Sequence, residues 1–441
     1  MAATTATRTP GPPFFDLISE ETTVSERGSL SRLSRRSLLA GLTGAAGAAL
    51  LLPRGSAGRP QARRLVAAVP DPVQEIHLAG TDGWVSMPPN SPAIAPFWPD
   101  SLAPTGSNLY VFGFRDVTGM NAVDVTAQRG KAQISAPMLT FDQETDIKIT
   151  LSNLGLAQRP DLVDGHTVHW HGFRNAIPLF DGVPELSIAV PIGRDFTYFY
   201  RPHDPGTYMY HCHFEDVEHV QMGMTGMLFV RPVQNKGTSS LPAGKYAYNC
   251  GDGSSRYDRE FAFMMTEIWA EAHYRDAHIQ VSDWTDYKPT FFALNGRAYP
   301  DTMASNGDPN SAAAGRLRYQ PISSLVTCNS GDRVLLRLAN LGYQDHVMTV
   351  DGIDLTVIGK DAALLRGRDG SSEYTVTNTV EIGPGESRDV LFTAPAPGTY
   401  LLYDRDYLAL TNGSGSGYGG QMTEIRVSPS GTLPAQTGPN A

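Results

Sequence analysis

Two short stretches of the chain collect most of its residues able to bind a transition metal. Residues 166–171 read His-Thr-Val-His-Trp-His, and residues 211–224 begin with His-Cys-His and contain a further histidine and methionines. Six of the eleven histidines and one of the three cysteines lie in these stretches. Zinc also takes imidazole and thiolate ligands, but a donor set that adds a thioether suits copper in a blue electron-transfer site. The composition of the two stretches therefore predicts copper.

Both stretches are expected to be β-strands, in which successive side chains point to opposite faces. Cys212 would then point away from its two histidine neighbours, and the first histidine of 166–171 away from the other two. This alternation predicts two sites back to back. The first would be built on His166 and Cys212. The second would hold four histidines: His169, His171, His211 and His213.

The first site needs two more ligands, and the residues after Cys212 supply them. His219 and Met224 follow in what reads as a loop returning to the next strand. His166, Cys212 and His219 would form a trigonal plane, with Met224 as the weak axial ligand. Met222 is the alternative axial ligand. Because the thiolate is the binding form of cysteine, the metal must displace the proton of Cys212.

The elements that position these ligands belong to an internal repeat. Segments 146–155 and 332–342 both alternate apolar and polar residues and end in Asn-Leu-Gly, and each is followed by a histidine and then by Gly-Thr-Tyr, at Gly206 and Gly398. Alternation over short segments separated by glycine and proline is typical of strands with one buried face. No long helical period appears. The fold class is therefore expected to be all-β, with two Greek-key β-sandwich domains.

The N-terminal region is expected to be an export signal. Residues 34–39 read Ser-Arg-Arg-Ser-Leu-Leu, which resembles a twin-arginine signal, and they precede a weakly apolar stretch at 38–52. That stretch is too short to cross a membrane as a mature helix. The plainer alternative is an irregular N-terminus with a chance arginine pair. An export signal predicts a periplasmic or extracellular protein.

We expect six segments along the chain. They are a signal region at 1–58, an N-terminal extension packing on domain one at 59–135, copper-binding domain one at 136–232, a linker at 233–257, domain two without copper motifs at 258–430, and a C-terminal tail at 431–441.

The two motifs resemble those of the multicopper oxidases, the laccase-like enzymes built from cupredoxin domains. The resemblance covers nearly all of the chain after residue 70. It implies that the first set is a type 1 copper site and that the four histidines are half of a trinuclear cluster. It also implies electron transfer from Cys212 through His211 and His213, the three residues expected to carry catalysis. The loop from Cys212 to His219 is two residues longer than the common laccase pattern.

Domain two departs from the family pattern, in which a facing domain, usually from a neighbouring subunit of a trimer, supplies four more histidines. Aligned on His346, the later histidine positions are Thr349 and Asp351. The counterparts of His-Cys-His are residues 403–405 or, with one inserted residue, 404–406, and neither triplet contains histidine. Four histidines cannot saturate three coppers, but they can hold one or two with open positions. Three aspartates could orient ligands or bind metal, although at least two are expected to be surface carboxylates: Asp351, Asp404 and Asp406.

Copper nitrite reductases offer a second comparison. By motif, His171 and His211 occupy their type 2 copper positions, and His346 resembles their substrate-pocket histidine. His169, however, stands where that family has a catalytic aspartate. The match is therefore poorer than the match to the oxidases.

The resulting hypothesis is an exported, copper-dependent oxidoreductase. A small-molecule or protein donor would deliver electrons near His219, whose ring edge is expected to face solvent, and the second site would reduce oxygen or another small acceptor. The family implies a homotrimer. The alternatives are a non-enzymatic blue-copper electron carrier and a nitrite reductase-like enzyme. A net charge of −10 argues against a nucleic-acid partner, and no membrane span is expected in the mature chain.

The remaining histidines and cysteines carry weaker expectations. His203 reads as a turn residue and His77 as a surface residue. His273 and His278 could reach the cluster of a neighbouring subunit. Cys250 and Cys328 could form a disulfide or stay unpaired, since the Cα separation decides between the two.

Overall fold

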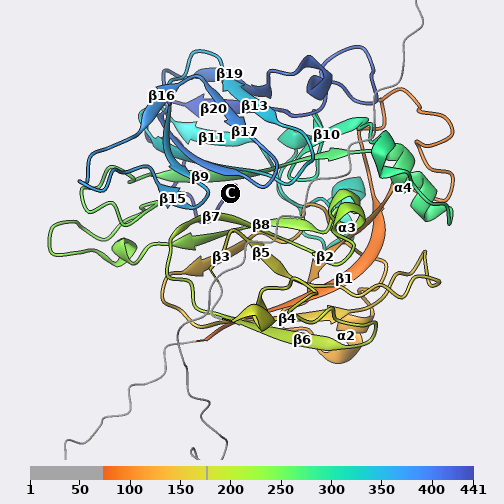
Figure 1. Cartoon of the computed structure of the whole chain (residues 1–441). Coiled ribbons are helices and arrows are strands. Elements are labelled where there is room, and N and C mark those ends of the chain that lie inside the picture. The colour runs from red at the N-terminus through yellow and green to blue at the C-terminus, as the bar shows by residue number, and fades with distance from the viewer. Residues whose placement is uncertain (1–72, 175–176) are drawn as a thin grey trace, which may run out of the picture. The chain divides into compact units, whose positions relative to one another are not determined.

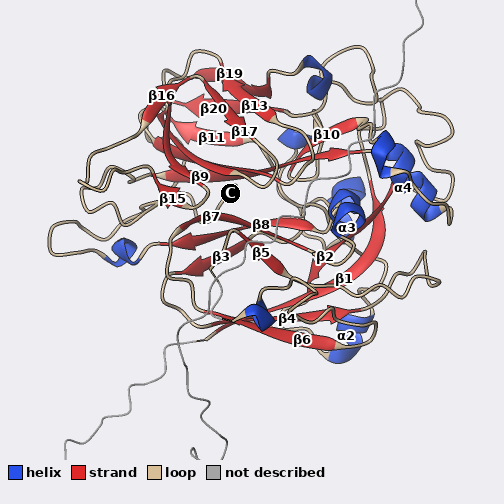
Figure 2. Ribbon diagram, viewed as in Figure 1, coloured by secondary structure: helices blue, strands red, loops and turns tan. Residues whose placement is uncertain are grey.

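A computed structural model describes residues 73–174 and 177–441. The signal region expected at 1–58 lies outside these residues. Strands dominate the described residues, and Figures 1 and 2 show them stacked as layered sheets. The helices are α2 (Ala122–Thr126), α3 (Asp216–Met222) and α4 (Ala270–Ala277). Six 3-10 segments lie in the connections: Pro178–Phe180, Val233–Lys236, Trp284–Asp286, Asp301–Met303, Ala312–Leu317 and Tyr407–Leu410.

The first domain is a sandwich of two four-stranded sheets. One sheet has the order β2-β1-β4-β6, and the other the order β3-β8-β7-β5. Apolar side chains from both sheets meet in one core that includes Trp170, Tyr210 and Cys212. The strands are β1 (Gln74–Val85), β2 (Leu109–Asp116), β3 (Leu139–Asp142), β4 (Ile147–Asn153), β5 (His169–His171), β6 (Asp195–Tyr200), β7 (Gly206–His211) and β8 (Thr225–Arg231).

The second domain repeats this plan with two larger sheets. Their orders are β10-β9-β12-β18-β14-β15, with β16 pairing β14, and β11-β20-β19-β13-β17. The strands are β9 (Arg259–Ile268), β10 (Phe291–Leu294), β11 (Val326–Asn329), β12 (Arg333–Asn340), β13 (His346–Val350), β14 (Leu355–Lys360), β15 (Ala363–Leu364), β16 (Thr375–Thr377), β17 (Thr379–Ile382), β18 (Ser387–Thr393), β19 (Gly398–Asp404) and β20 (Met422–Ser428). The all-β, two-sandwich prediction is confirmed.

The expected extension at 59–135 is corrected by the position of β1. This strand lies between β2 and β4, parallel to β4, so the segment from Gln74 to Asp116 supplies two strands of the first sandwich. The residues from Leu78 to Gly83 are buried without a break. A strand buried on both faces has no period-two alternation, which is why the sequence pattern did not identify it.

The two domains pack sheet against sheet. Met209 and Phe229 on the outer face of the β3-β8-β7-β5 sheet contact Ala262 and Met264 of β9, and strands β7, β8 and β9 run beside one another in Figure 1. Side chains on β7 that face domain two alternate with those that enter the core of domain one. Histidines at the end of this strand therefore lie at the seam between the domains.

A buried ionic network crosses the same seam. The fully buried Arg337 guanidinium donates to Glu260 and to the Thr207 hydroxyl, at 3.2 and 3.0 Å, and lies 3.5 Å from Asp389. The ring of Phe229 lies under the same guanidinium, 4.5 Å away. Asp389 therefore depends on this cation for its charge balance, whereas Glu260 is also paired with Arg231, 2.7 Å away.

Replacing that cation should be strongly destabilising. Arg337→Met leaves Asp389 buried without a counter-charge and leaves Glu260 with Arg231 alone, and we expect the free energy of unfolding to fall by about 3–5 kcal/mol. Chemical denaturation would measure this free energy. Arg426→Met is the control, because the Arg426–Glu424 pair is half exposed and exposed pairs contribute less than about 1 kcal/mol. Equal losses in the two variants would contradict the role of the network.

Candidate metal centre

The first set of donors converges in the core of domain one. His166, Cys212 and His219 are fully buried, and their ligand atoms lie within 4.8 Å of one another. The Cys212 Sγ atom is 3.3 Å from Nδ1 of His219, and the backbone N–H of Thr167 donates to that sulfur at 3.4 Å. Three residues distant in sequence thus present one sulfur and two nitrogens to a common point.

Each ligand of this set is positioned by a different element. His166 pairs with Val190 in an isolated β-bridge, and Cys212 directly follows β7. His219 lies in the last turn of α3, and Met224 follows the Gly223 that ends this helix. The expectation of a loop between Cys212 and Met224 is corrected: Asp216–Met222 form a short helix that begins after Glu215, whose φ is +47°.

Met224 is placed beside the triad by its contact with β1. A Cβ atom added to Gly80 would lie 2.7 Å from Cδ2 of His166 and 3.4 Å from Cε of Met224. The two side chains therefore border the same space, which supports Met224 over Met222 as the axial donor. Gly80 is a residue of the site that the motifs did not reveal.

A side chain at position 80 should weaken copper binding at the first set. Gly80→Ala places a methyl group against the fully buried His166 ring, which must tilt to make room. We expect copper affinity of the first site to fall about 10- to 100-fold, the usual cost of disturbing a ligand's support. Competition with a copper chelator measures this change. Gly438→Ala, where a Cβ meets nothing within 4 Å, is the control and should bind copper as the native chain does.

The electrostatics of the triad favour a metal. Burial opposes ionisation of Cys212, but the neighbouring His219 and His166 rings outweigh it and hold the pKa of the thiol well below its usual range. Burial also opposes protonation of His219, yet the Cys212 thiolate and Asp164 raise the pKa of its imidazole to about 10. Neither ring nitrogen of the buried His166 has a hydrogen-bond partner. A bound copper would satisfy one of these nitrogens and replace the positive charge beside the thiolate.

The ring edge of His219 does not face solvent, so that expectation is wrong. The side chain is fully buried, with Phe112 at 5.6 Å between ring centroids and Phe214 at 6.0 Å. Its Nε2 atom points toward the Asp164 carboxylate, 3.6 Å away. Neither this carboxylate nor the aromatic cover of His219 carries a signal in the sequence.

The second set of donors lies on the opposite face of the same strands, as alternation predicted. His169 and His211 are paired across β5 and β7, and His169, His171 and His211 bring one nitrogen each to within 4.8 Å of one another. His213 lies against two of them, with ring centroids 5.2 Å from His169 and 5.6 Å from His211. Three of the four histidines therefore converge and the fourth lies beside them.

Hydrogen bonds orient two of these rings. Nδ1 of His169 donates to the Asp181 carbonyl at 2.6 Å, and Nδ1 of His211 donates to the Cys212 carbonyl at 2.8 Å. Each ring then has Nε2 left to bind a metal, the arrangement usual for metal-bound histidine, and Nε2 of His211 lies 3.4 Å from Nδ1 of His171. Burial lowers the pKa of His211 to about 3, and burial also lowers that of His169 and His171. Burial therefore favours the neutral form of these imidazoles, which is the form that binds a metal ion.

Domain two borders this second set without adding a histidine. A Cβ atom on Gly385, in the turn before β18, would lie 3.0 Å from Nε2 of His171. Strand pairing also identifies the counterparts of the ligands in domain two. His169 pairs with His211 in the first domain, and Thr349 pairs with Tyr403 in the second. The alignment without an insertion is therefore correct, and the four histidine positions hold Thr349, Asp351, Tyr403 and Arg405.

The same register gives the counterparts of the first set. His346, Asp404 and Gln421 take the positions of His166, Cys212 and Met224. His346 is not available as a ligand, because Nδ1 lies 2.6 Å from Asp404 and Nε2 lies 2.6 Å from Glu267. Burial opposes its protonation, but the two carboxylates outweigh it and raise the pKa of His346 to about 9.

Of the three aspartates, Asp351 and Asp406 are exposed, as expected for at least two of them, whereas Asp404 is fully buried.

The other histidines and cysteines lie apart from both sets. His273 is buried within its own chain, with Nδ1 2.6 Å from the Tyr110 carbonyl, so it cannot reach a neighbouring subunit. His278 pairs with Asp100 at 2.9 Å. His203 is exposed and paired with Glu144, and His77 is half-buried beside Ser152. All three cysteines are unpaired, so Cys250 and Cys328 form no disulfide.

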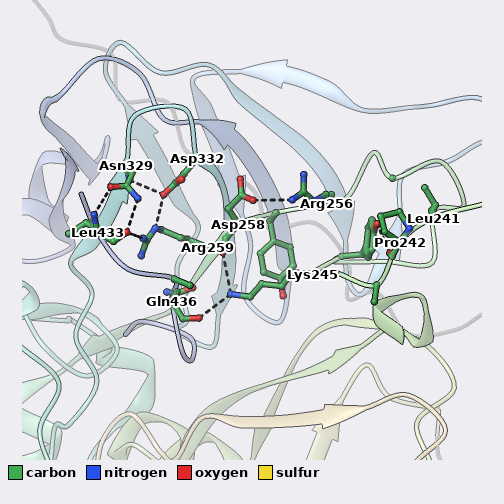
Figure 3. Close-up of a pocket in the computed structure, with 16 residues that line it drawn as sticks. Leu241, Pro242, Lys245, Arg256, Asp258, Arg259, Asn329, Asp332, Leu433 and Gln436 are labelled. Atoms are coloured by element: carbon green, nitrogen blue, oxygen red, sulfur yellow. Dashed lines mark hydrogen bonds and ion pairs between the residues drawn. The ribbon is translucent and has the colours of Figure 1, made fainter. Parts of the chain in front are cut away.

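A cavity of about 790 Å³ in domain two is not part of either set. Figure 3 shows it lined by the linker and the C-terminal segment, with Arg259 paired to Asp332 and Lys245 bonded to the backbone. Lys245 Nζ donates to the Asp258 and Gln436 carbonyls at 3.2 Å, and Arg256 lies 3.6 Å from Asp258. These charges are already paired, so the cavity gives no reason to place chemistry there.

Comparisons with known proteins agree with the two metal-binding motifs. Residues 122–235 and 260–421, together more than half of the chain, match two family models described as multicopper oxidase. Laccase-5 of Arabidopsis thaliana is 26% identical over 260 residues, which cover 56% of this chain and 37% of that protein. Laccase ustL of Ustilaginoidea virens is 39% identical over 99 residues, 22% of this chain and 14% of that protein. The chain thus spans little more than a third of the length of the plant relative.

Solved structures share the fold at low identity. A blue copper oxidase from Nitrosomonas europaea has a TM-score of 0.58 at 21% identity, covering 81% of this chain and 86% of that one. A copper nitrite reductase from Nitrosomonas europaea has a TM-score of 0.53 at 15% identity, covering 84% and 99%. Across the described residues, no helix is long and apolar enough to span a membrane. The matches to both domain models, with the donor sets on either face of β7, show that this chain belongs to the multicopper oxidase family.

Proposed function

We propose that the chain is a copper-dependent, laccase-type oxidoreductase. It takes electrons one at a time at the first set, which consists of His166, Cys212, His219 and Met224. It delivers them to an acceptor at the second set, which consists of His169, His171, His211 and His213. The observation that carries the proposal is the junction of the two sets. Cys212 lies between His211 and His213 in sequence, and Nδ1 of His211 donates to the carbonyl of Cys212 at 2.8 Å. One residue thus joins both sets through covalent bonds and a hydrogen bond.

Copper, when bound, would supply one-electron redox chemistry at the first set and a binding position for a small acceptor at the second. The protein's residues supply geometry and access. Phe112 and Phe214 exclude water from His219, while Thr167 and the strand pairing of β7 hold Cys212 in place. Because no histidine of domain two faces the second set, the described residues provide donors for one or two metal ions there.

The donor is proposed to approach on the Asp164 side of the first set. Asp164 and Glu215 bring carboxylate oxygens to within 4.8 Å of His219, and the Asp164 carboxylate lies 3.6 Å from Nε2 of that ring. A small molecule or a protein donor must therefore transfer electrons through this acidic rim. The acceptor is proposed to be oxygen or another small molecule.

We also propose a linker at 233–257 and a second domain at 258–430, export through the twin-arginine-like residues 34–39, and assembly as a homotrimer. The support for export is the sequence pattern alone, since residues 34–39 lie outside the described part. The trimer rests on the family resemblance. Sedimentation of the purified protein tests assembly, and substitution of both Arg35 and Arg36 by lysine tests export.

Counting copper per chain, recording the optical spectrum and following oxygen uptake test the function together. We expect an intense blue band, at least two copper ions per chain and oxygen consumption with a phenolic dye. One copper with a blue band and no oxygen consumption would identify an electron carrier instead. Reduction of nitrite in place of oxygen would identify a reductase.

A further inference from the structure

Helix α3, which carries His219, is held from domain two as well as from its own domain. The side-chain amide of Gln221 in α3 donates to the Glu267 carbonyl of β9 at 2.9 Å, and the Tyr343 hydroxyl donates to the Val217 carbonyl. The helix is only seven residues long, and no side chain caps its N-terminus. An isolated helix of this length is not stable, so its position depends on such contacts.

Glu267 is the residue on which these contacts converge. Its carboxylate accepts from the backbone N–H of Tyr343 at 2.7 Å and from the Tyr287 hydroxyl at 2.9 Å. The backbone N–H of Gln344 donates to the same carboxylate at 3.2 Å. A Cβ atom on Gly342 would lie 2.2 Å from the Glu267 carboxylate, so the backbone can pass this close to the carboxylate only with glycine at position 342.

His346 fixes the carboxylate from the other side. The imidazole lies between Glu267 and Asp404, 2.6 Å from each, and all three side chains are at most 3% exposed. Asp404 is itself held by the backbone N–H of Asp406 at 2.8 Å. The counterpart of Glu267 in domain one is Asp82, as the pairing of β1 with β4 and of β9 with β12 shows. Asp82 also binds backbone N–H groups and a tyrosine hydroxyl, but it is one methylene shorter.

We propose that Glu267, clamped by His346 and Asp404, is a positioning residue of the first metal site, which acts on His219 through Tyr343, Gln221 and helix α3. Domain two thus uses the positions equivalent to the copper ligands of domain one to set the geometry of the site in domain one. The carboxylate holds Tyr343, Tyr343 holds the Val217 carbonyl, and two residues further along the helix His219 meets Cys212.

The inference rests on the proposed copper site, and its test separates the two. In the copper-loaded full chain, Glu267→Gln keeps the shape of the side chain but removes the charge that pairs with His346 and weakens the bond to Tyr343. We expect copper content to stay at the native level, while the blue absorption band shifts and loses intensity and the reduction potential changes. Absence of copper in the native chain would refute the copper site itself. A native spectrum and potential in Glu267→Gln would overturn only the positioning role.

Glu260→Gln is the matched control. Glu260 lies on the same strand β9, is equally buried at 3% exposure, and also accepts from a tyrosine hydroxyl, that of Tyr257. It is paired with Arg337 and Arg231 rather than with α3. Its substitution should lower the melting temperature and leave the blue band unchanged. An equal spectral change in both variants would mean that general loosening of domain two is responsible, which overturns the proposal.

Tyr343→Phe provides a second test of the proposal in case the Glu267→Gln chain does not fold. It removes only the hydroxyl that binds Val217 and should leave the Glu267–His346 pair intact. We expect the same direction of spectral change with a smaller amplitude. An unchanged spectrum in Tyr343→Phe would overturn the path through α3.

Discussion

The Cys212→Ser chain is expected to lose its blue absorption completely and to oxidise no donor. The thiolate is the donor that gives a type 1 copper its colour and its electronic path, and a serine hydroxyl replaces neither. Turnover should fall by more than about 100-fold, beyond the usual cost of disturbing a residue that merely supports a ligand. Visible absorption and dye oxidation measure the two losses.

The opposite face of β7 should be unaffected by this change. His169, His171 and His211 converge without any contribution from the sulfur, so copper bound by these histidines should remain. It should absorb little visible light and still give a signal in electron paramagnetic resonance. Cys250→Ser is the control, because Cys250 is also a buried thiol but lies outside both donor sets, bonded to Gln234 and Ser255. A chain that keeps its blue colour after Cys212→Ser would refute the ligand assignment.

Local pattern was sufficient to predict the division of the donors into two sets. Period-two alternation places Cys212 in the core of domain one and turns His211 toward domain two, and the strand pairing of His169 with His211 follows from that. The two sandwiches could also be predicted, because their central strands show apolar alternation and the repeat aligns them. These features depend only on neighbours in sequence or on one strand pair.

The features that the sequence did not reveal depend on contacts between distant segments. The strand β1 has no alternation because both of its faces are buried. The helix that carries His219 is stabilised partly by domain two, through the bond from Tyr343 to Val217 and the bond from Gln221 to Glu267. The burial of His219 results from Phe112, a residue of a strand more than a hundred positions earlier. Asp404 likewise could not be told apart from the exposed Asp351 and Asp406 in the sequence, because its burial depends on the strand pairing that brings it beside His346.

Removing a histidine from the second set should separate electron uptake from electron delivery. In His211→Ala the first set keeps all four of its residues, so the blue band should form and a donor should bleach it. Delivery requires an acceptor held by His169, His171 and His211, and only two of these nitrogens remain. The bleached protein should therefore recover its colour in air more than about 100-fold more slowly than the native chain, since the loss of a ligand costs more than the loss of its support.

This outcome depends on Cys212 staying in place when its neighbour is changed. The bond from Nδ1 of His211 to the Cys212 carbonyl is lost. The pairing of β7 with β8 and the bond from the Cys212 backbone N–H to the Met224 carbonyl, at 3.2 Å, hold the cysteine independently. His203→Ala is the control, because His203 is exposed and paired only with Glu144, and it should bleach and recover as the native chain does. Fast recovery of colour in His211→Ala would mean that the first set reduces the acceptor alone, and the histidine face would then have no part in turnover.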